Sequence, residues 1–256
     1  MSKSAEESRR VIVKRFAEDA TEACAKLFRQ IALQSVEARG TFCVSLAGGT
    51  TPYALYERLA RQATSQHMPW GELQVFFGDE RDVPHDHVES NFRMTQRTLL
   101  DHVPIPLGRV HPMPADAEDL DVAASEYEKA VRRIVPAGKQ GAPRFDLILL
   151  GMGADGHTAS LFPHTTALTE QDRLVVAQFV PVLGRYRMTF TFPLINAAQD
   201  VILLVTGDDK GEAVEELLSG GADPQKLPAA GVSPTDGRLT FVFDAAAARR
   251  AGLRAD

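Results

Sequence analysis

The chain has 256 residues, of which 44% are hydrophobic and 24% charged, enough to bury the core of one large domain or two small ones. Its 28 basic and 34 acidic residues give a net charge of −6, which argues against a general nucleic-acid binder. The polar start MSKSAEESRR lacks a secretory signal, and no apolar run approaches the roughly 20 residues of a spanning helix, so we expect a cytoplasmic protein outside the membrane.

Short β-rich runs alternate with helical patterns along most of the chain. The expected strands are VIVKRF (11–16), TFCVSL (41–46), LQVFFG (73–78), FDLILLG (145–151), LVVAQFV (174–180), MTFTF (188–192), VILLVTG (201–207) and LTFVF (239–243). Apolar stripes with helical spacing run through 18–38 and 116–134. The segments LILL and VILLV are apolar throughout, which is typical of parallel strands covered on both faces. We therefore predict a single α/β domain over residues 1–256.

Two stretches between the expected elements, and the two cysteines, also carry structural expectations. The stretches VHPMPAD (110–116) and PAGKQGAP (136–143) are expected to be surface connections, too short for a domain linker. Cys24 lies in a helical pattern and Cys43 in an expected strand. Both are interpreted as small core hydrophobes in a reducing compartment, with a disulfide between them as the less favoured alternative.

Three of the expected strands end in loops that are rich in glycine or charge. TFCVSL continues into AGGTTP, LQVFFG into DERDVP, and LILL into GMGADGHTASLFP. In open α/β sheets, ligands bind in the crevice outside the carboxyl ends of the strands. We therefore expect these three loops to converge on one site.

The loop AGGTTP has the composition of a phosphate site at a helix start. Gly48 and Gly49 permit close backbone approach, Thr50 and Thr51 supply hydroxyls, and Pro52 suits a first helical turn. Amides at such a helix start favour an anion. The alternative interpretation is a tight turn between strand and helix, because the loop matches neither a Walker A motif nor G-x-G-x-x-G.

The second loop places Asp79, Glu80 and Arg81 at a strand end. Taken alone, such a triplet is a solvated charge cluster. Beside a phosphate loop, however, Arg81 could act as a fixed positive charge that faces a substrate oxygen.

The third loop contains one histidine, His157, with Asp155 two residues before it. A helix-capping or packed histidine is one interpretation. The preceding glycines, however, leave the imidazole little side-chain cover, and Asp155 could orient or charge-balance the ring. A positioned histidine with a nearby carboxylate is typical of a general base.

The stretch VPHDHVESN offers His85 and His87 as metal ligands, but no third ligand has a defined spacing, so we favour a solvated loop. No G-x-S-x-G motif is present, which argues against a Ser-His-Asp hydrolase. We therefore expect no metal.

Together these segments resemble the 6-phosphogluconolactonases, within the group that includes the glucosamine-6-phosphate deaminases. The matching segments follow the family's order and are SLAGGTTP (45–52), FFGDER (76–81), ESNFRM (89–94), LGMGADGHTASLFP (150–163), RMTFTFPLIN (187–196) and VTGDDKGEA (205–213). The resemblance implies a Rossmann-like open, mostly parallel sheet with helices on both faces (NagB/RpiA/CoA transferase-like). It also implies cofactor-free hydrolysis of 6-phosphoglucono-1,5-lactone to 6-phosphogluconate in the pentose phosphate pathway.

The resemblance assigns roles to individual residues of this chain. It places the catalytic role on His157 and implies contact of Arg81 with the substrate and the oxyanion. Arg187 and Lys210 resemble phosphate ligands alongside the glycine loop. Strand alternation sends Arg187 to the same face as Thr189 and Thr191, so a solvated strand face is the alternative there. Asp79 either contacts sugar hydroxyls or holds Arg81.

Two other functions remain as alternatives. In the deaminase branch the histidine loop continues with Asn-Glu-Pro, whereas this chain has Leu161, Phe162 and Pro163, so the glutamate used in sugar ring opening is replaced. This departure favours the lactonase. A non-catalytic phosphosugar-binding regulator usually carries a DNA-binding extension, for which we expect no room before the first strand. The expected partner is a small phosphosugar lactone, bound by a monomer or a small homo-oligomer.

Overall fold

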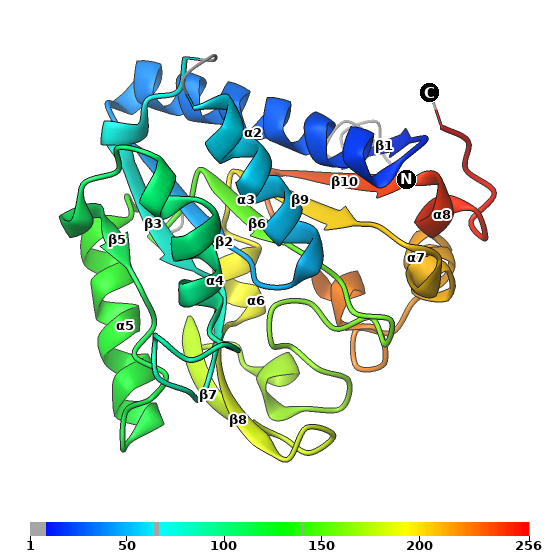
Figure 1. The fold of residues 1–256 in the computed structure, drawn as a ribbon. Coiled ribbons are helices and arrows are strands. Elements are labelled where there is room, and N and C mark those ends of the chain that lie inside the picture. Colours follow the sequence, from blue (N-terminus) through cyan, green and yellow to red (C-terminus); the bar gives the residue numbers. More distant parts are fainter. Residues whose placement is uncertain (1–8, 64–66, 140, 256) are drawn as a thin grey trace.

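A seven-stranded parallel sheet forms the centre of the computed structural model, which describes residues 9–63, 67–139 and 141–255 (Figure 1). All neighbouring strands run parallel. In spatial order they are β1 (Arg9–Lys14), β10 (Arg238–Asp244), β9 (Asp200–Val205), β6 (Leu147–Leu150), β2 (Phe42–Leu46), β3 (Leu73–Phe77) and β5 (Val110–His111). The predicted α/β architecture with a mostly parallel sheet is confirmed.

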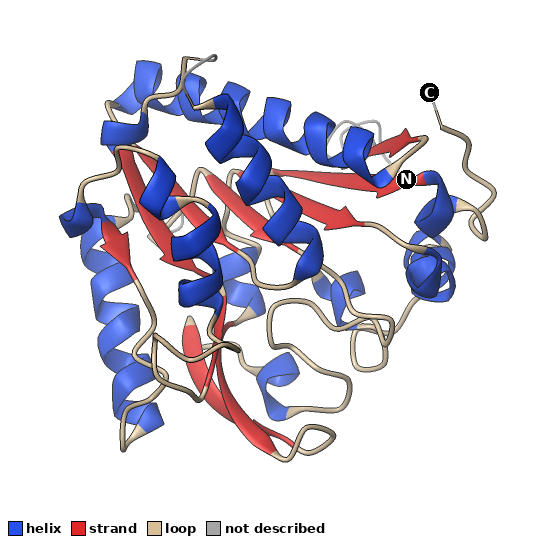
Figure 2. Ribbon diagram, in the orientation of Figure 1, coloured by secondary structure: helices blue, strands red, loops and turns tan. Residues whose placement is uncertain are grey.

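A second, antiparallel sheet lies beside the main one, below it in the view of Figure 2. Its strands are β4 (Asp79–Arg81), β8 (Arg185–Phe190) and β7 (Val175–Val180), in that order. The expected strands 174–180 and 188–192 therefore belong outside the parallel sheet. The second of them begins earlier than predicted and ends at Phe190, because Thr191 caps a new helix at Phe192.

The helices flank these sheets. Their bounds are α2 (Ala17–Arg39), α3 (Thr50–Gln62), α4 (Asn91–Thr98), α5 (Leu120–Ile134), α6 (Phe192–Ile195), α7 (Gly211–Leu218) and α8 (Ala245–Ala248). Figure 1 shows α2 and α3 lying over one face of the main sheet. No helix in the described part of the chain combines the length and apolar character needed to cross a membrane.

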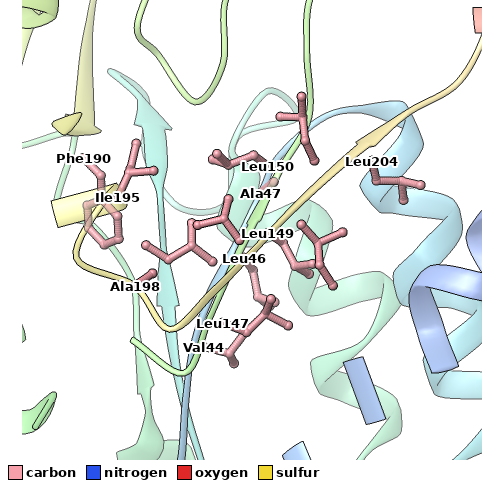
Figure 3. Close-up of a cluster of buried hydrophobic side chains, with 14 of the residues drawn as sticks. Val44, Leu46, Ala47, Leu147, Leu149, Leu150, Phe190, Ile195, Ala198 and Leu204 are labelled. Carbon is pink, nitrogen blue, oxygen red and sulfur yellow. The ribbon is translucent and has the colours of Figure 1, made fainter. Parts of the chain in front are cut away.

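The core sits where the central strands are covered on both faces. Every residue of β2, β6 and β9 is buried, and for β6 and β9 the apolar runs LILL and VILLV predicted this. Figure 3 shows Val44, Leu147 and Leu204 from these strands in one cluster with Phe190 of β8 and Ile195 of α6. The second sheet is therefore packed onto the same core as the first.

Several expected boundaries differ from the structure. The first strand ends at Lys14 because Phe16 already takes the extended position before α2. The helix predicted from residue 116 begins at Leu120, since the Asp119 side chain accepts the first free amides, those of residues 121 and 122. The expected surface connection 110–116 is wrong in part. It contains β5, which extends the sheet beside β3, and it buries Met113 completely.

Both cysteines are buried and free, as predicted. Burial raises the pKa of the Cys24 and Cys43 thiols to about 12. The reactive thiolate forms are therefore scarce at neutral pH, and the two side chains serve as small core groups.

The Glu128 carboxylate fastens α5 to the second sheet. Its side chain is 11% exposed, and one oxygen accepts the backbone N–H groups of Leu174 (2.9 Å) and Val175 (3.3 Å) at the start of β7. The other oxygen accepts two hydrogen bonds from Arg132. Burial works to raise the pKa of Glu128, but these hydrogen bonds outweigh it and hold the pKa below its ordinary value.

We predict that Glu128→Gln lowers the free energy of unfolding at neutral pH by about 1.5–3 kcal/mol, the usual contribution of hydrogen bonds to a charged group. A carboxyl whose pKa is depressed by folding stabilises the protein above its unfolded pKa, and this contribution is lost as the pH falls through the folded pKa. The difference from wild type should therefore shrink below pH 4.5. Urea unfolding of both proteins at neutral pH and below pH 4.5 measures this difference in the free energy of unfolding.

The matched control is Glu126→Gln, which changes an exposed carboxylate on the same helix and should alter stability little. Equal stability of wild type and Glu128→Gln at neutral pH, or a difference that grows on acidification, would contradict this assignment.

Candidate active site

The three polar loops meet at one edge of the sheet, as expected, because β6, β2 and β3 are neighbours. Together with the loop after β9 they enclose a cleft of about 220 Å³. Most of the predicted site residues line this cleft, namely Gly48, Gly49, Thr50, Thr51, Asp79, Arg81, His157 and Lys210. Depressions of about 630 and 590 Å³ lie elsewhere, and among these three hollows of the described residues the cleft alone combines the glycine loop with a histidine, an acid and two cations.

The glycine loop is built for close backbone approach. Gly48 packs against Asn91 so tightly that a Cβ would lie 1.9 Å from the Asn91 amide oxygen. Gly49 has φ of 99° and precedes α3, which begins at Thr50. The first amides of a helix have no intrahelical acceptor, so this end of α3 offers N–H donors and a positive dipole to an anion.

The charged triplet Asp79–Arg81 forms the ordered strand β4 and is not a solvated cluster. Asp79 and Glu80 are buried. The Glu80 carboxylate accepts the Ser90 hydroxyl (3.0 Å) and the backbone N–H groups of Asn91 (2.8 Å) and Phe92 (2.9 Å). Burial raises the pKa of Glu80, while the hydrogen bonds from the amides oppose that shift. Glu80 thus fixes the start of α4 beside the cleft.

The Asp79 carboxylate is held from two sides. One oxygen accepts the Asn91 side-chain N–H (3.2 Å), and the other accepts the Ser160 hydroxyl (2.6 Å). Ser160 is fixed in turn, because its carbonyl accepts from Gln178 and its amide donates to the Thr189 hydroxyl (3.2 Å). Sequence reasoning missed Asn91 and the role of Ser160. The available signal was the segment ESNFRM, in which Ser90 caps α4.

His157 is restrained on its ring nitrogen and on its ring face. Its Nδ1 lies 2.6 Å from a carboxylate oxygen of Asp155, as the spacing suggested. The Phe162 ring stacks on the imidazole at 4.2 Å between centroids and 19° between planes. The expectation of little side-chain cover is therefore wrong, although 31% of the His157 side chain stays exposed. Gly153 leaves room for the ring, since a Cβ at this position would lie 2.2 Å from His157 Nδ1.

Asp155 stands behind the histidine and outside the residues that line the cleft. Burial works to raise its pKa, but the hydrogen bond and charge interaction with His157 outweigh it, so the pKa of Asp155 lies below its ordinary value. The carboxylate is therefore ionised at neutral pH. An ionised acceptor at Nδ1 leaves Nε2 as the ring nitrogen able to accept a proton.

Of the three predicted cationic residues, Arg81 and Lys210 line the cleft and Arg187 does not. Arg81 lines the cleft and donates to the Glu89 carbonyl at 2.5 Å. Lys210 also lines it, at the turn between β9 and α7, with its amine 2.8 Å from Asp209.

Arg187 does not line the cleft but pairs directly with Arg81 in the ladder between β4 and β8. It is 8% exposed, which overturns the alternative of a solvated strand face. Its guanidinium donates to the Tyr186 carbonyl (2.8 Å) and lies 3.5 Å from Asp82. Burial and the neighbouring charge of Arg81 lower the pKa of Arg187.

The two histidines of the stretch VPHDHVESN, His85 and His87, contact separate partners. His85 Nε2 lies 2.7 Å from the Met113 carbonyl, and His87 Nδ1 accepts the Glu89 amide at 3.2 Å. Among residues 9–63, 67–139 and 141–255, no three His, Cys, Asp or Glu side chains gather in a way that could hold a metal.

Residues 15–241 match the model of a family described as glucosamine-6-phosphate isomerases/6-phosphogluconolactonase. A 6-phosphogluconolactonase of Synechocystis sp. is 46% identical over 211 residues, which cover 82% of this chain and 85% of that protein. The structure of 6-phosphogluconolactonase from Trypanosoma cruzi has a TM-score of 0.84 and 30% identity, covering 94% of this chain and 96% of that one.

The structure of a monomeric glucosamine-6-phosphate deaminase is also similar, with a TM-score of 0.79. It is 21% identical and covers 94% of this chain and 99% of that one, so this likeness concerns the fold alone. On the match of the family model and the identity to the Synechocystis protein, the chain belongs to the glucosamine-6-phosphate isomerase/6-phosphogluconolactonase family.

Proposed function

We propose that the protein is a cytoplasmic 6-phosphogluconolactonase that hydrolyses 6-phosphoglucono-1,5-lactone to 6-phosphogluconate. The observation that carries this proposal is the His157 imidazole, which lines the cleft while its Nδ1 is bound by the ionised Asp155. An imidazole oriented in this way can accept a proton at Nε2 and return it. The similarity to the Synechocystis 6-phosphogluconolactonase supports the same reaction.

The proposed chemistry needs one proton acceptor and one stabilised oxyanion. His157 Nε2 takes a proton from water as the water oxygen bonds to the lactone carbonyl carbon. The carbonyl oxygen gains negative charge, which Arg81 at the cleft wall stabilises. The bond from that carbon to the ring oxygen then breaks, and the imidazolium gives its proton to the leaving oxygen. General acid–base catalysis of this kind contributes about 10²–10⁴-fold in rate.

The phosphate of the substrate is assigned to the positive end of the cleft. The start of α3 at Thr50 offers backbone amides, and Lys210 offers an ammonium group on the same cleft. Arg81 and Arg187 stand directly opposite each other in an antiparallel ladder, where like charges repel. A dianion bound beside them would relieve that repulsion. Asp79, fixed by Asn91 and Ser160, is assigned to the sugar hydroxyls.

The deaminase alternative is disfavoured by Phe162. This residue stands where the deaminase branch has a glutamate, and its ring is stacked on His157. A phenyl ring accepts no proton, so it cannot assist sugar ring opening. A lactone is already an activated cyclic ester and needs no such assistance. A non-catalytic sugar-phosphate binder would not require the Asp155–His157 pair.

An assay with freshly prepared 6-phosphogluconolactone and, separately, glucosamine 6-phosphate tests the proposed reaction. We expect lactone hydrolysis well above the spontaneous rate and no ammonia release. Ammonia release without lactone hydrolysis would establish the deaminase alternative, and the absence of both activities would favour the non-catalytic binder.

We predict that His157→Gln lowers kcat by about 10²–10⁴-fold, because it removes the proton acceptor. Asp155→Asn should lower kcat in the same direction but less, because the imidazole remains while its charged partner is lost. Circular dichroism and unfolding curves should stay close to wild type, since the His157 side chain is partly exposed. The control His67→Gln changes an exposed histidine and should keep full activity. Near-wild-type turnover in folded His157→Gln would remove this residue from the mechanism.

We predict that Lys210→Ala weakens binding of 6-phosphogluconolactone about 10- to 150-fold, the equivalent of a charge-assisted contact of roughly 1.5–3 kcal/mol. Arg187→Ala should act in the same direction. Unphosphorylated gluconolactone should be affected far less by either change. Lys129→Ala, an exposed lysine on α5, serves as control. Comparison of KM for the two substrates is the measurement, and equal losses on both would assign these residues to the fold or to the carbonyl chemistry.

We also predict that exhaustive chelation leaves lactonase activity unchanged, because water activated by His157 can attack the ester without a Lewis acid. The assay compares activity before and after dialysis against a chelator. Activity that disappears on chelation and returns with zinc or magnesium would contradict the metal-free mechanism and point to His85 and His87 as metal ligands.

A further inference from the structure

We propose that a groove between α3 and α4 is a second binding site, which takes a nucleotide. The α3–α4 groove has a volume of about 630 Å³ and is lined by Tyr53, Glu57, Ala60, Arg61, Val88, Arg93, Met94, Arg97, Thr98 and His102. Binding pockets for small molecules typically measure about 300–1,000 Å³. None of these residues has a part in the proposed hydrolysis of the lactone.

The groove has an apolar end near the catalytic cleft and arginines along its whole length. Both helices begin beside the catalytic cleft, where Asn91 of α4 touches Gly48 next to α3. Tyr53 and Met94 therefore lie at the end near the cleft. Arg61 follows Tyr53 by eight residues, or about 12 Å along the helix.

The apolar end exposes groups that a soluble surface normally covers. Tyr53 is 43% exposed and Val88 is 75% exposed, and Met94 lines the same groove. The Tyr53 hydroxyl donates to Glu57 at 3.2 Å, which restrains the ring along the helix. An exposed, restrained aromatic ring beside aliphatic groups is a stacking surface for a planar ring.

The arginines of the groove carry more positive charge than its one acidic side chain neutralises. Arg93 and Arg97 are four residues apart on α4 and line the same groove. Within the described residues, neither guanidinium has an acidic side chain within 4.0 Å, and Arg61 has one contact of 3.8 Å with Glu57. In a chain of net charge −6, three arginines around one glutamate form a local anion site.

A nucleotide matches this combination. Its base would stack on Tyr53, and its phosphates would reach the arginines along the groove, from Arg93 beside Met94 on α4 to Arg61, about 12 Å from Tyr53 along α3. A phosphosugar has no planar ring for the apolar end. The space between groove and cleft is lined by Gly49, Thr50 and Arg81 together with Tyr53, so the bound nucleotide would lie beside the substrate entrance.

Titration calorimetry on the full chain tests this proposal with three probes: ADP, adenosine and inorganic tripolyphosphate. We expect saturable binding of ADP at one site, weaker binding of tripolyphosphate and the weakest binding of adenosine. The double variant Arg93→Ala/Arg97→Ala should weaken ADP at least about tenfold, and added salt should weaken it as well. Tyr53→Ala should weaken ADP while leaving tripolyphosphate unchanged. Arg133→Ala, an exposed arginine on α5, is the matched control and should bind ADP normally.

Three results would overturn the proposal. One is no saturable binding of ADP. Another is binding of tripolyphosphate as tight as that of ADP and insensitive to Tyr53→Ala, which would reveal a simple polyanion site. The third is ADP binding lost in Lys210→Ala but retained in the groove variants, which would place the nucleotide in the catalytic cleft. All three readouts are independent of lactone hydrolysis, so they do not depend on the proposed enzymatic function.

Discussion

The carboxylate of Asp79 joins the three loops on which the site depends. Asn91 binds one of its oxygens and also fills the space beside Gly48, so the glycine loop and α4 are placed by the same side chain. Ser160, from the histidine loop, binds the other oxygen. Hydrogen bonds to a charged group each contribute about 1.5–3 kcal/mol, enough to hold loops that would otherwise move independently. The position of His157 relative to the glycine loop follows from this shared acceptor.

Two arginines are held close together in this chain despite its net charge of −6. Arg81 and Arg187 face each other in the β4–β8 ladder, which costs free energy unless nearby anions compensate. Asp82 and the Glu89 carbonyl supply part of that compensation within the protein. The pairing of these two cations is therefore set by the backbone register of β4 and β8 and not by the net charge of the chain.

The likeness to both lactonases and a deaminase shows that the fold leaves the reaction open. The proposed function rests in part on one side chain of the histidine loop. Phe162 covers one face of the His157 ring and provides no proton acceptor of its own. The imidazole is thereby left with Asp155 as its ionised partner, an arrangement suited to activating water.

The sequence by itself determined the parallel sheet and the set of loops that form the site. Uninterrupted apolar runs such as LILL and VILLV are typical of strands covered on both faces, and glycine, acid and histidine at the strand ends indicated the crevice. Local patterns also gave the Asp155–His157 pair, because two residues of separation suffice for that contact.

Only the tertiary structure decided the remaining features, since they rest on contacts between residues distant in the chain. Ser160 reaches Asp79 across 81 positions, and Arg187 meets Arg81 only because β4 leaves the parallel sheet to pair with β8. Periodicity describes the surroundings of one segment at a time. It therefore did not tell the strands of the second sheet from those of the first, allowed a solvated position for Arg187 and did not predict that the Phe162 ring contacts His157.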